Sequence, residues 1–182
     1  MTAALLLIDR QNDGFPGGTM ARAGSVYAAP SAVVLPAALR DRQLPVVHVQ
    51  HVSTRTGATF FRPGTRGVAI HHGVAPRSGE TVVQNPVPNG FRDSPLLQHL
   101  REQTVTDLVI AGMMTPMCMD TSKRAAADLG FRCRLAHDAC ATRRLAFGTR
   151  TVAAADVQAA FMASLNGPFA NVASAREICA TP

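Results

Sequence analysis

The sequence contains no tryptophan, a single tyrosine and a single lysine, Lys123, among its 182 residues. Without large aromatic rings the chain lacks the stacking surfaces on which single-stranded nucleic acids bind, and its arginines are scattered rather than gathered in a patch. We therefore do not expect nucleic-acid binding, despite a formal net charge of +6. Long apolar runs are also missing, because proline, arginine or glycine interrupts each of them, so no membrane span is expected.

Only four cysteines are present, at spacings that match neither a zinc motif nor a dense disulfide framework. They are Cys118, Cys133, Cys140 and Cys179. The apolar run at residues 3–8 begins without a preceding basic segment, which indicates a first strand and not a signal peptide. These features predict a cytoplasmic protein. The length and the hydrophobic fraction of 47% predict one globular domain over residues 1–182.

Short apolar runs alternate along the chain with segments of helical periodicity. Residues 54–78 contain glycines and two prolines and are typical of a long functional loop. The order of elements predicts an α/β fold, with an open, mostly parallel sheet covered by helices on both faces. Strands are expected at residues 3–9, 45–50, 81–84, 106–111, 131–136 and 169–172, and helices at residues 30–42, 94–102, 116–129, 151–165 and 174–179.

Polar side chains come after most of the expected strands, close to the point where each strand ends. In strand order these residues are Asp9, His51, Asn85, Cys118 and Asp138. In open parallel sheets the ligand binds outside the carboxyl ends of the strands, so we expect these side chains to converge on one edge. A carboxylate close to a thiol could accept its proton and later protonate a leaving group.

The segment around Cys118 has the pattern of a nucleophile at the start of a helix. Gly112 permits an unusual backbone, Thr115 can cap a helix, and Pro116 suits the first helical position. Cys118 would then lie in the first turn of the helix at residues 116–129, where unpaired N–H groups and the helix dipole favour a thiolate. The residues alone leave open that Cys118 is a buried structural cysteine.

Several segments resemble the isochorismatase-like cysteine hydrolases, a superfamily that includes nicotinamidases and N-carbamoylsarcosine amidohydrolases. Residues 5–18 (LLLIDRQNDGFPGG) resemble the opening strand of that superfamily. Residues 109–121 (VIAGMMTPMCMDT) resemble its nucleophile segment, and residues 125–131 and 137–142 resemble the two segments next along the family's chain. Residues 44–65 are similar to a subgroup labelled only as cysteine hydrolases.

This resemblance implies a three-layer α/β/α sandwich with a doubly wound sheet of about six strands. It also implies a cysteine-dependent hydrolase that cleaves the C–N bond of a small amide, or of a related carbonyl compound, through an acyl-enzyme. By similarity, Asp9 is the base, Cys118 is the nucleophile, and the N–H groups of Met114 and Cys118 form the oxyanion hole. Relatives commonly have a cis peptide at the position of Met113–Met114. The expected partner is a small-molecule substrate, the expected assembly is a homodimer or homotetramer, and no cofactor is expected.

The catalytic lysine of the superfamily is missing. Six residues before Phe91, where the resemblance places it, stands Asn85, which can donate hydrogen bonds but carries no charge. Lys123 is expected on the surface. Arg10 is expected to point away from the catalytic carboxylate, so Arg92 is the better candidate for a replacement cation. The missing charge motivates an alternative function, a catalytically impaired member that binds a small molecule or a partner. A vinyl-ether activity that needs no cysteine, also present in the superfamily, would leave the cysteine unexplained.

The remaining candidates are side chains that could contact the substrate near this edge. They are Gln11, Phe60, Phe61, Phe91 and Arg92. The two adjacent phenylalanines, Phe60 and Phe61, fit a pocket lining and a loop anchor equally well.

No metal ion is expected. Nicotinamidase relatives bind a metal through an Asp-x-His pair after the second strand, and here residues 51–53 read His-Val-Ser. The nearby histidines, His48, His51, His71 and His72, show no clean ligand spacing. His48, on an apolar strand, is expected to be a hydrogen-bonded core residue.

Overall fold

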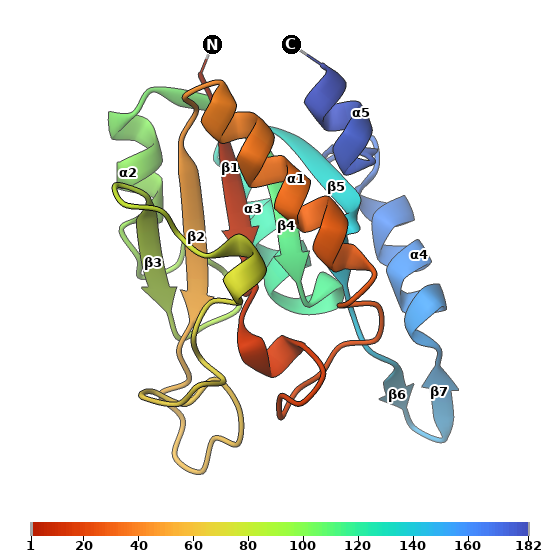
Figure 1. Cartoon of the computed structure of the whole chain (residues 1–182). Coiled ribbons are helices and arrows are strands. Elements are labelled where there is room, and N and C mark those ends of the chain that lie inside the picture. The colour runs from red at the N-terminus through yellow and green to blue at the C-terminus, as the bar shows by residue number, and fades with distance from the viewer. Residues whose placement is uncertain (1, 182) are drawn as a thin grey trace.

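A six-stranded parallel sheet forms the centre of the protein in the computed structural model, which describes residues 2–181 (Figure 1). Its strands are β1 (Thr2–Ile8), β2 (Val46–His51), β3 (Thr81–Asn85), β4 (Val105–Met113), β5 (Arg132–Ala141) and β8 (Asn171–Ala173). Across the sheet the order is β3-β2-β1-β4-β5-β8. The order of the strands reverses between the neighbours β1 and β4, which makes the space outside their carboxyl ends the topological switch point.

Helices cover both faces of the sheet (Figure 1). The alternating side chains of β1 point to both layers: Leu5 and Leu7 pack with α1 and α5, whereas Leu6 and Ile8 pack with α2, α3 and α4. The expected three-layer α/β/α sandwich is therefore confirmed. No helix within residues 2–181 is long and apolar enough to cross a membrane. The helices are α1 (Ala28–Asp41), α2 (Leu96–Glu102), α3 (Asp120–Asp128), α4 (Ala154–Leu165) and α5 (Ala175–Ala180).

Some elements differ from the sequence predictions. Pro36 lies inside α1 and does not end it. β5 is longer than predicted and includes Asp138, whose carboxylate accepts hydrogen bonds from Ser31 Oγ at 2.9 Å and from Ala175 N at 2.8 Å. A short antiparallel hairpin precedes α4, in a region without a predicted strand. Its strands are β6 (Leu145–Phe147) and β7 (Arg150–Val152).

The backbones of β1 and β4 come into close contact at Gly112. This glycine has a φ of 149°, and a Cβ atom there would lie 2.0 Å from the carbonyl oxygen of Ile8. Only glycine fits this position, because the neighbouring backbone occupies the space of any side chain. The unusual backbone that the sequence indicates is confirmed, and it brings the ends of the two central strands together.

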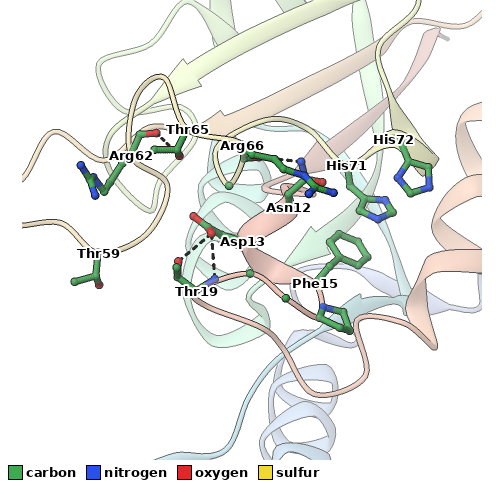
Figure 2. A pocket seen from close by; sticks show the side chains of 14 residues that line it. Asn12, Asp13, Phe15, Thr19, Thr59, Arg62, Thr65, Arg66, His71 and His72 are labelled. Atoms are coloured by element: carbon green, nitrogen blue, oxygen red, sulfur yellow. Dashed lines mark hydrogen bonds between the residues drawn. The ribbon is translucent and has the colours of Figure 1, made fainter.

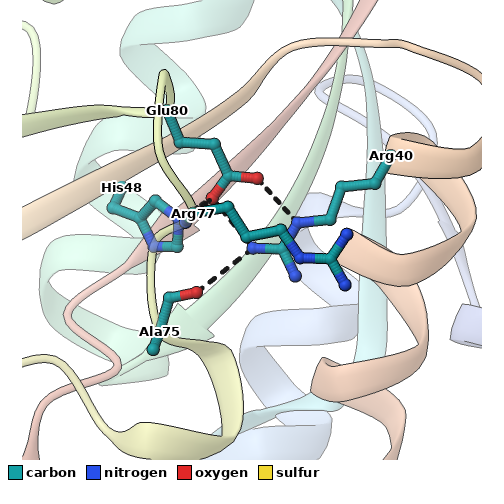
Figure 3. A network of polar contacts seen from close by, with 5 residues as sticks. All are labelled: Arg40, His48, Ala75, Arg77 and Glu80. Atoms are coloured by element: carbon teal, nitrogen blue, oxygen red, sulfur yellow. Dashed lines mark hydrogen bonds and ion pairs between the residues drawn. The ribbon is translucent and has the colours of Figure 1, made fainter.

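A polar cluster around Glu80 fixes the β2–β3 side of the molecule (Figure 3). Arg40 donates to both carboxylate oxygens of Glu80, at 2.6 and 2.8 Å, and His48 Nε2 lies 3.1 Å from Oε2. Arg77 N also donates to this carboxylate at 2.9 Å. Burial alone would raise the pKa of Glu80, but these hydrogen bonds and the charge of Arg40 lower the pKa to about 2. His48 is thus a hydrogen-bonded core residue, as predicted.

Candidate active site

Asp9 and Cys118 come together at the switch point, in agreement with their places after β1 and β4. One carboxylate oxygen of Asp9, the Cys118 sulfur and one ring nitrogen of His51 all lie within 4.8 Å of one another. The Asp9 side chain is 3% exposed. Its backbone has a φ of 49°, and its N–H donates to the Val49 carbonyl at 2.9 Å. This left-handed conformation, which is uncommon outside glycine, turns the chain at the end of β1.

The turn that carries Cys118 is not the predicted regular helix start. Thr115–Met119 forms a π-helical turn in which Met117 has non-helical angles, φ −124° and ψ −105°, and α3 begins only after it. Thr115 does not cap this turn, because its hydroxyl donates to Gln158 Oε1 at 2.6 Å. The predicted helix is therefore wrong in its first turn, and the sulfur is held by a distorted turn.

The peptide bond between Met113 and Met114 is cis, as the resemblance implies. The N–H groups of Met117 and Met119 both donate to the Met114 carbonyl, at 3.0 and 3.4 Å. The Cys118 N–H faces its own sulfur closely enough to favour the thiolate. The N–H groups of the two residues next to Cys118 are therefore used within the turn.

The pKa values of the two candidate catalytic groups are both raised. Burial raises the pKa of Asp9 to about 7, against the opposing effects of the Cys118 thiol and of a nearby arginine. Burial and the Asp9 carboxylate raise the pKa of Cys118 well above its ordinary value. The thiolate-stabilising helix start expected from the sequence is therefore not found, because the Cys118 thiol is buried and its pKa is raised.

Asn85, at the position of the family lysine, is used by a loop. Its Nδ2 donates to the carbonyls of Asn89 and Arg92, at 2.9 and 3.1 Å, and its Oδ1 accepts from Val87 N at 2.6 Å. Both amide protons are therefore bound by the connection between β3 and α2. The Asn85 side chain therefore stabilises this loop and supplies no charge to the site.

The two arginines considered as replacements lie away from the catalytic pair. Arg10 Nη1 donates to the Ala139 carbonyl at 3.4 Å, and the guanidinium lies 5.2 Å from the Phe15 ring centroid, on the far side of β1 as predicted. The Arg92 side chain is 67% exposed and pairs with Asp93 at 3.2 Å. Neither arginine is placed to act as a replacement cation, so the structure does not support the hypothesis that Arg92 replaces the family lysine.

Lys123 is not a surface residue, so that prediction is wrong. Its side chain is 0% exposed, and α3 packs this face against the sheet together with Ser122 and Ala126. The Nζ atom has no hydrogen-bond partner among the described residues and lies 5.4 Å from the Phe169 ring centroid. Burial lowers the pKa of this lysine. Because α3 points it toward Phe169, it is no substitute for the family lysine.

A buried arginine that the sequence does not single out acts on the pair through its charge. Arg22 is 7% exposed and precedes α1. Burial and the charge of Arg143 lower its pKa, whereas the charges of Cys118, Asp9 and Asp13 raise it. No local motif marks this arginine. The sequence shows only that the family lysine is missing, and it does not show which loop at the carboxyl edge could supply another cation.

His51 also faces the pair, and the sequence points only to its place at the end of β2. Burial lowers its pKa, so the ring is neutral at pH 7, and its Nδ1 atom is buried without a partner among the described residues. The Phe61 ring packs edge-on against it, with centroids 5.6 Å apart. Asp9, His51 and Cys118 together form the one group in residues 2–181 that could ligate a metal ion. The ligand spacing in the sequence gives no indication of this group.

The other predicted substrate contacts serve the framework. Gln11 is fully buried, with its amide bonded to the backbones of His51 and Val68. Phe91 stacks on Phe131 in the layer of α2 and α3, with centroids 6.1 Å apart. Phe61 is buried and donates its N–H to Asp13 at 2.6 Å.

Phe60 packs edge-on against Phe61, with ring centroids 5.4 Å apart, and is only partly buried. Of the two phenylalanines, Phe61 therefore matches the loop-anchor interpretation, and Phe60 retains a side chain that solvent can reach.

A cavity of about 480 Å³ lies between the turn at Asn12–Gly14 and the long loop after β2 (Figure 2). Figure 2 shows Asp13 at its wall, held by hydrogen bonds from the backbone and hydroxyl of Thr19. Gly67 is required here, because a Cβ atom would lie 2.3 Å from an Asp13 oxygen. Neither Asp9 nor Cys118 is among the lining residues, so this cavity does not contain the Asp9–Cys118 pair.

The model of the isochorismatase domain family matches residues 3–177. The chain belongs to the isochorismatase family. It is 45% identical over 172 residues to the isochorismatase family protein YddQ of Bacillus subtilis, a match that covers 94% of this chain and 96% of YddQ. Like other isochorismatase family proteins, it is therefore assigned to the hydrolases, and the Asp9–Cys118 pair lies at the switch point of the family fold.

Two further similarities extend the isochorismatase assignment. A crystal structure from Oleispira antarctica, assigned to the isochorismatase hydrolases, superposes with a TM-score of 0.95 at 49% identity, covering 98% of this chain and 96% of that one. Maleamate amidohydrolase of Pseudomonas putida is 32% identical over 143 residues, covering 71% of this chain and 67% of that enzyme. The family thus contains an enzyme named for amide hydrolysis.

Proposed function

We propose that this isochorismatase family protein hydrolyses the C–N bond of a small amide through an acyl-enzyme on Cys118. The observation that carries the proposal is the contact between the thiol and the buried Asp9 carboxyl, whose pKa is raised to about 7. A base with this pKa can both remove and return a proton at neutral pH. The similarity to maleamate amidohydrolase supports an amide as the substrate class.

In the proposed cycle, Asp9 removes the proton of the Cys118 thiol as the sulfur attacks the carbonyl carbon. The N–H groups of Met114 and Cys118 hold the oxyanion that forms. When the C–N bond breaks, Asp9 gives its proton to the leaving amine, and a thioester remains. Water then attacks the thioester, Asp9 removes a proton from that water, and the acid departs as the thiol is re-formed.

A substrate screen with matched serine variants tests this function. The panel contains maleamate and other small primary and N-carbamoyl amides, with ammonia or amine release as the readout. We expect Cys118→Ser to lower kcat of any accepted amide by at least about 10³-fold, because the hydroxyl is a far weaker nucleophile at this pH. Cys179→Ser, at a half-buried cysteine beside α1, is expected to stay within about twofold. Equal activity of the Cys118 variant and wild type would contradict the cysteine mechanism.

The second candidate is a member of the family that binds a small molecule without turning it over. The observation that favours it is the use of Asn85 by the β3–α2 loop, together with the raised pKa of Cys118. Calorimetry with the same panel separates the two functions. Binding of an amide with no product formed after long incubation would select the binding protein.

A further inference from the structure

The cavity of about 480 Å³ beside the long loop after β2 has a backbone frame that hydrogen bonds hold in place (Figure 2). Asn12 N donates to the Ala69 carbonyl and Asp13 N donates to the Gly67 carbonyl, both at 3.0 Å. The Asn12 side chain also donates to the Arg66 carbonyl at 2.9 Å. The loop is thus fastened to the segment that follows β1, so a ligand can enter without having to order the loop first.

Asp13 is the only carboxylate among the residues that line this cavity. Its Oδ1 accepts hydrogen bonds from Thr19 N and Oγ1, at 3.1 and 2.9 Å, and its Oδ2 accepts one from Phe61 N at 2.6 Å. Burial alone would raise the pKa of Asp13, but these hydrogen bonds and the charge of Arg22 lower it. Both oxygens are therefore used by the wall, which argues against a cation as the ligand.

Two arginines, Arg62 and Arg66, also line the cavity. Neither guanidinium donates a hydrogen bond or forms an ion pair within the described residues 2–181. Their backbones are held, because Thr65 Oγ1 donates to the Arg62 carbonyl at 2.8 Å and Asn12 binds the Arg66 carbonyl. A guanidinium presents a planar set of donors that matches a carboxylate through two parallel hydrogen bonds. The charge of this wall therefore favours an anion with carboxylate groups.

Flat rings form another part of the wall. Figure 2 shows Phe15 beside His71, and these two rings stack with centroids 3.8 Å apart. The His72 ring follows, with its centroid 4.2 Å from that of His71. His71 Nδ1 accepts a hydrogen bond from Gly73 N at 3.2 Å, which fixes the orientation of the ring. A cavity of this volume, many times the ~30 Å³ that one water occupies, suits a flat organic molecule better than a bare ion.

We propose that this cavity binds a small, flat organic acid, with its carboxylates on Arg62 and Arg66 and its ring against His71 and His72. The site goes beyond the proposed hydrolase, since neither Asp9 nor Cys118 lines the cavity. The proposed cycle uses none of these four residues.

The test is titration calorimetry with isophthalate, a benzene ring that carries two carboxylates. Its neutral counterpart is 1,3-dinitrobenzene, in which nitro groups of nearly the same shape replace the carboxylates. We expect isophthalate to bind saturably, with one molecule per chain, and dinitrobenzene to bind at least about tenfold more weakly.

Variants of the wall locate the binding. Arg66→Met and Arg62→Met are each expected to weaken isophthalate by about tenfold or more, because each removes a charge-assisted pair. Arg66→Lys keeps the charge without the planar donors and should lose about threefold. Arg55→Met is the matched control, since Arg55 is exposed on the same loop but does not line the cavity. It should stay within about twofold, because removal of a distant exposed charge has little effect.

The contribution of the rings is measured separately. His72→Ala should weaken isophthalate by about threefold or more and leave the affinity for inorganic phosphate unchanged. Phosphate that binds wild type as tightly as isophthalate would overturn the proposal, because the ring would then contribute nothing.

Thermal melting identifies any variant that fails to fold, and Arg66→Lys with Arg55→Met then decides the location. Absence of saturable isophthalate binding to wild type at millimolar concentration overturns the proposal. So does an equal affinity of wild type, Arg62→Met and Arg66→Met. The measurement involves no turnover, so a chain that binds isophthalate through these arginines but hydrolyses no amide would keep this site and lose only the proposed function.

Discussion

The protein contains two clusters in which a carboxylate lies near a histidine and is affected by the charge of an arginine. The pKa of the carboxylate shifts in opposite directions in the two clusters. Glu80, His48 and Arg40 form one cluster, in which the arginine binds the carboxylate directly through two hydrogen bonds (Figure 3). Asp9, His51 and Cys118 form the other, and Arg22 acts on the Asp9 carboxyl through its charge. The pKa of Glu80 falls to about 2, whereas that of Asp9 rises to about 7.

The difference lies in how completely each cluster satisfies its polar groups. Around Glu80 the arginine, the histidine and a backbone N–H all contact the carboxylate. Around Asp9, His51 Nδ1 and Arg22 Nε remain buried without partners among the described residues. A carboxylate whose hydrogen bonds are all satisfied has a structural role, because any change of its charge costs much free energy. An incompletely paired one changes charge near neutral pH and is available for chemistry.

Removal of the Asp9 charge is expected to give the largest effect. Asp9→Asn should lower kcat by at least about 10³-fold, because no base then takes the thiol proton. It should also stabilise the fold at pH 8. The pKa of Asp9 rises from 3.8 to about 7 on folding, so its stabilising contribution is complete below pH 3.8 and is lost as the pH rises through 7. The loss amounts to as much as about 4 kcal/mol.

Melting curves at pH 5 and pH 8, combined with the pH profile of kcat/KM, check both parts. For wild type, the activity should rise through a midpoint near pH 7 as Asp9 ionises. A rate independent of pH between 5.5 and 8, or an Asp9→Asn variant less stable than wild type at pH 8, would contradict the assignment of this pKa.

Zinc is expected to inhibit, since Asp9, His51 and Cys118 offer the kinds of ligand atom that this ion prefers. A carboxylate, an imidazole and a thiol within 4.8 Å of one another provide three ligands, and metal binding would displace the thiol proton. Micromolar Zn²⁺ should therefore abolish turnover, and EDTA should restore it. His51→Ala should weaken the inhibition by about tenfold or more. His72→Ala, at the neighbouring cavity, serves as the control.

If EDTA alone removes the activity of the untreated enzyme, the ion belongs to the mechanism and the cysteine cycle needs revision. Equal sensitivity of wild type and His51→Ala would show that the ion binds elsewhere.

Glu80→Gln should reverse the pattern of the Asp9 variant, losing stability while keeping activity. The pKa of Glu80 falls from 4.5 to about 2, so its contribution is present above pH 4.5 and is lost as the pH falls toward 2. At pH 7 we expect a loss of about 2–3 kcal/mol from the free energy of unfolding. Urea unfolding at pH 7 and pH 3 measures it. A loss as large at pH 3 as at pH 7 would show that packing, and not charge, holds this cluster.

The smallest expected effect concerns the other buried cation. Lys123 has an unpartnered Nζ and a lowered pKa, so its charge is maintained at a cost in stability. Lys123→Met, which keeps the apolar stem, should raise the free energy of unfolding by about 1 kcal/mol at pH 7 and leave turnover within twofold. Thermal melting with the amide assay checks both. Destabilisation would mean that the contact with the Phe169 ring outweighs the cost of burial.

The sequence predicts the layers, the parallel sheet and the meeting of Asp9 with Cys118, because these result from apolar periodicity and from strand ends that share an edge. It does not predict the distorted turn at Thr115–Met119, since Thr-Pro there is equally compatible with a regular helix start. It also places Lys123 at the surface, because charge alone cannot say which face of α3 packs inward. The sequence does not predict the place of Arg22, because that place depends on contacts made by the fold. These are a backbone hydrogen bond to Gly14 and a bridge between the next residue and the segment directly after β5.

The hydrogen bonds of Asn85 limit which residues can replace it. Its side chain closes the β3–α2 loop through three hydrogen bonds, so a lysine introduced at that position would break these bonds and loosen the loop.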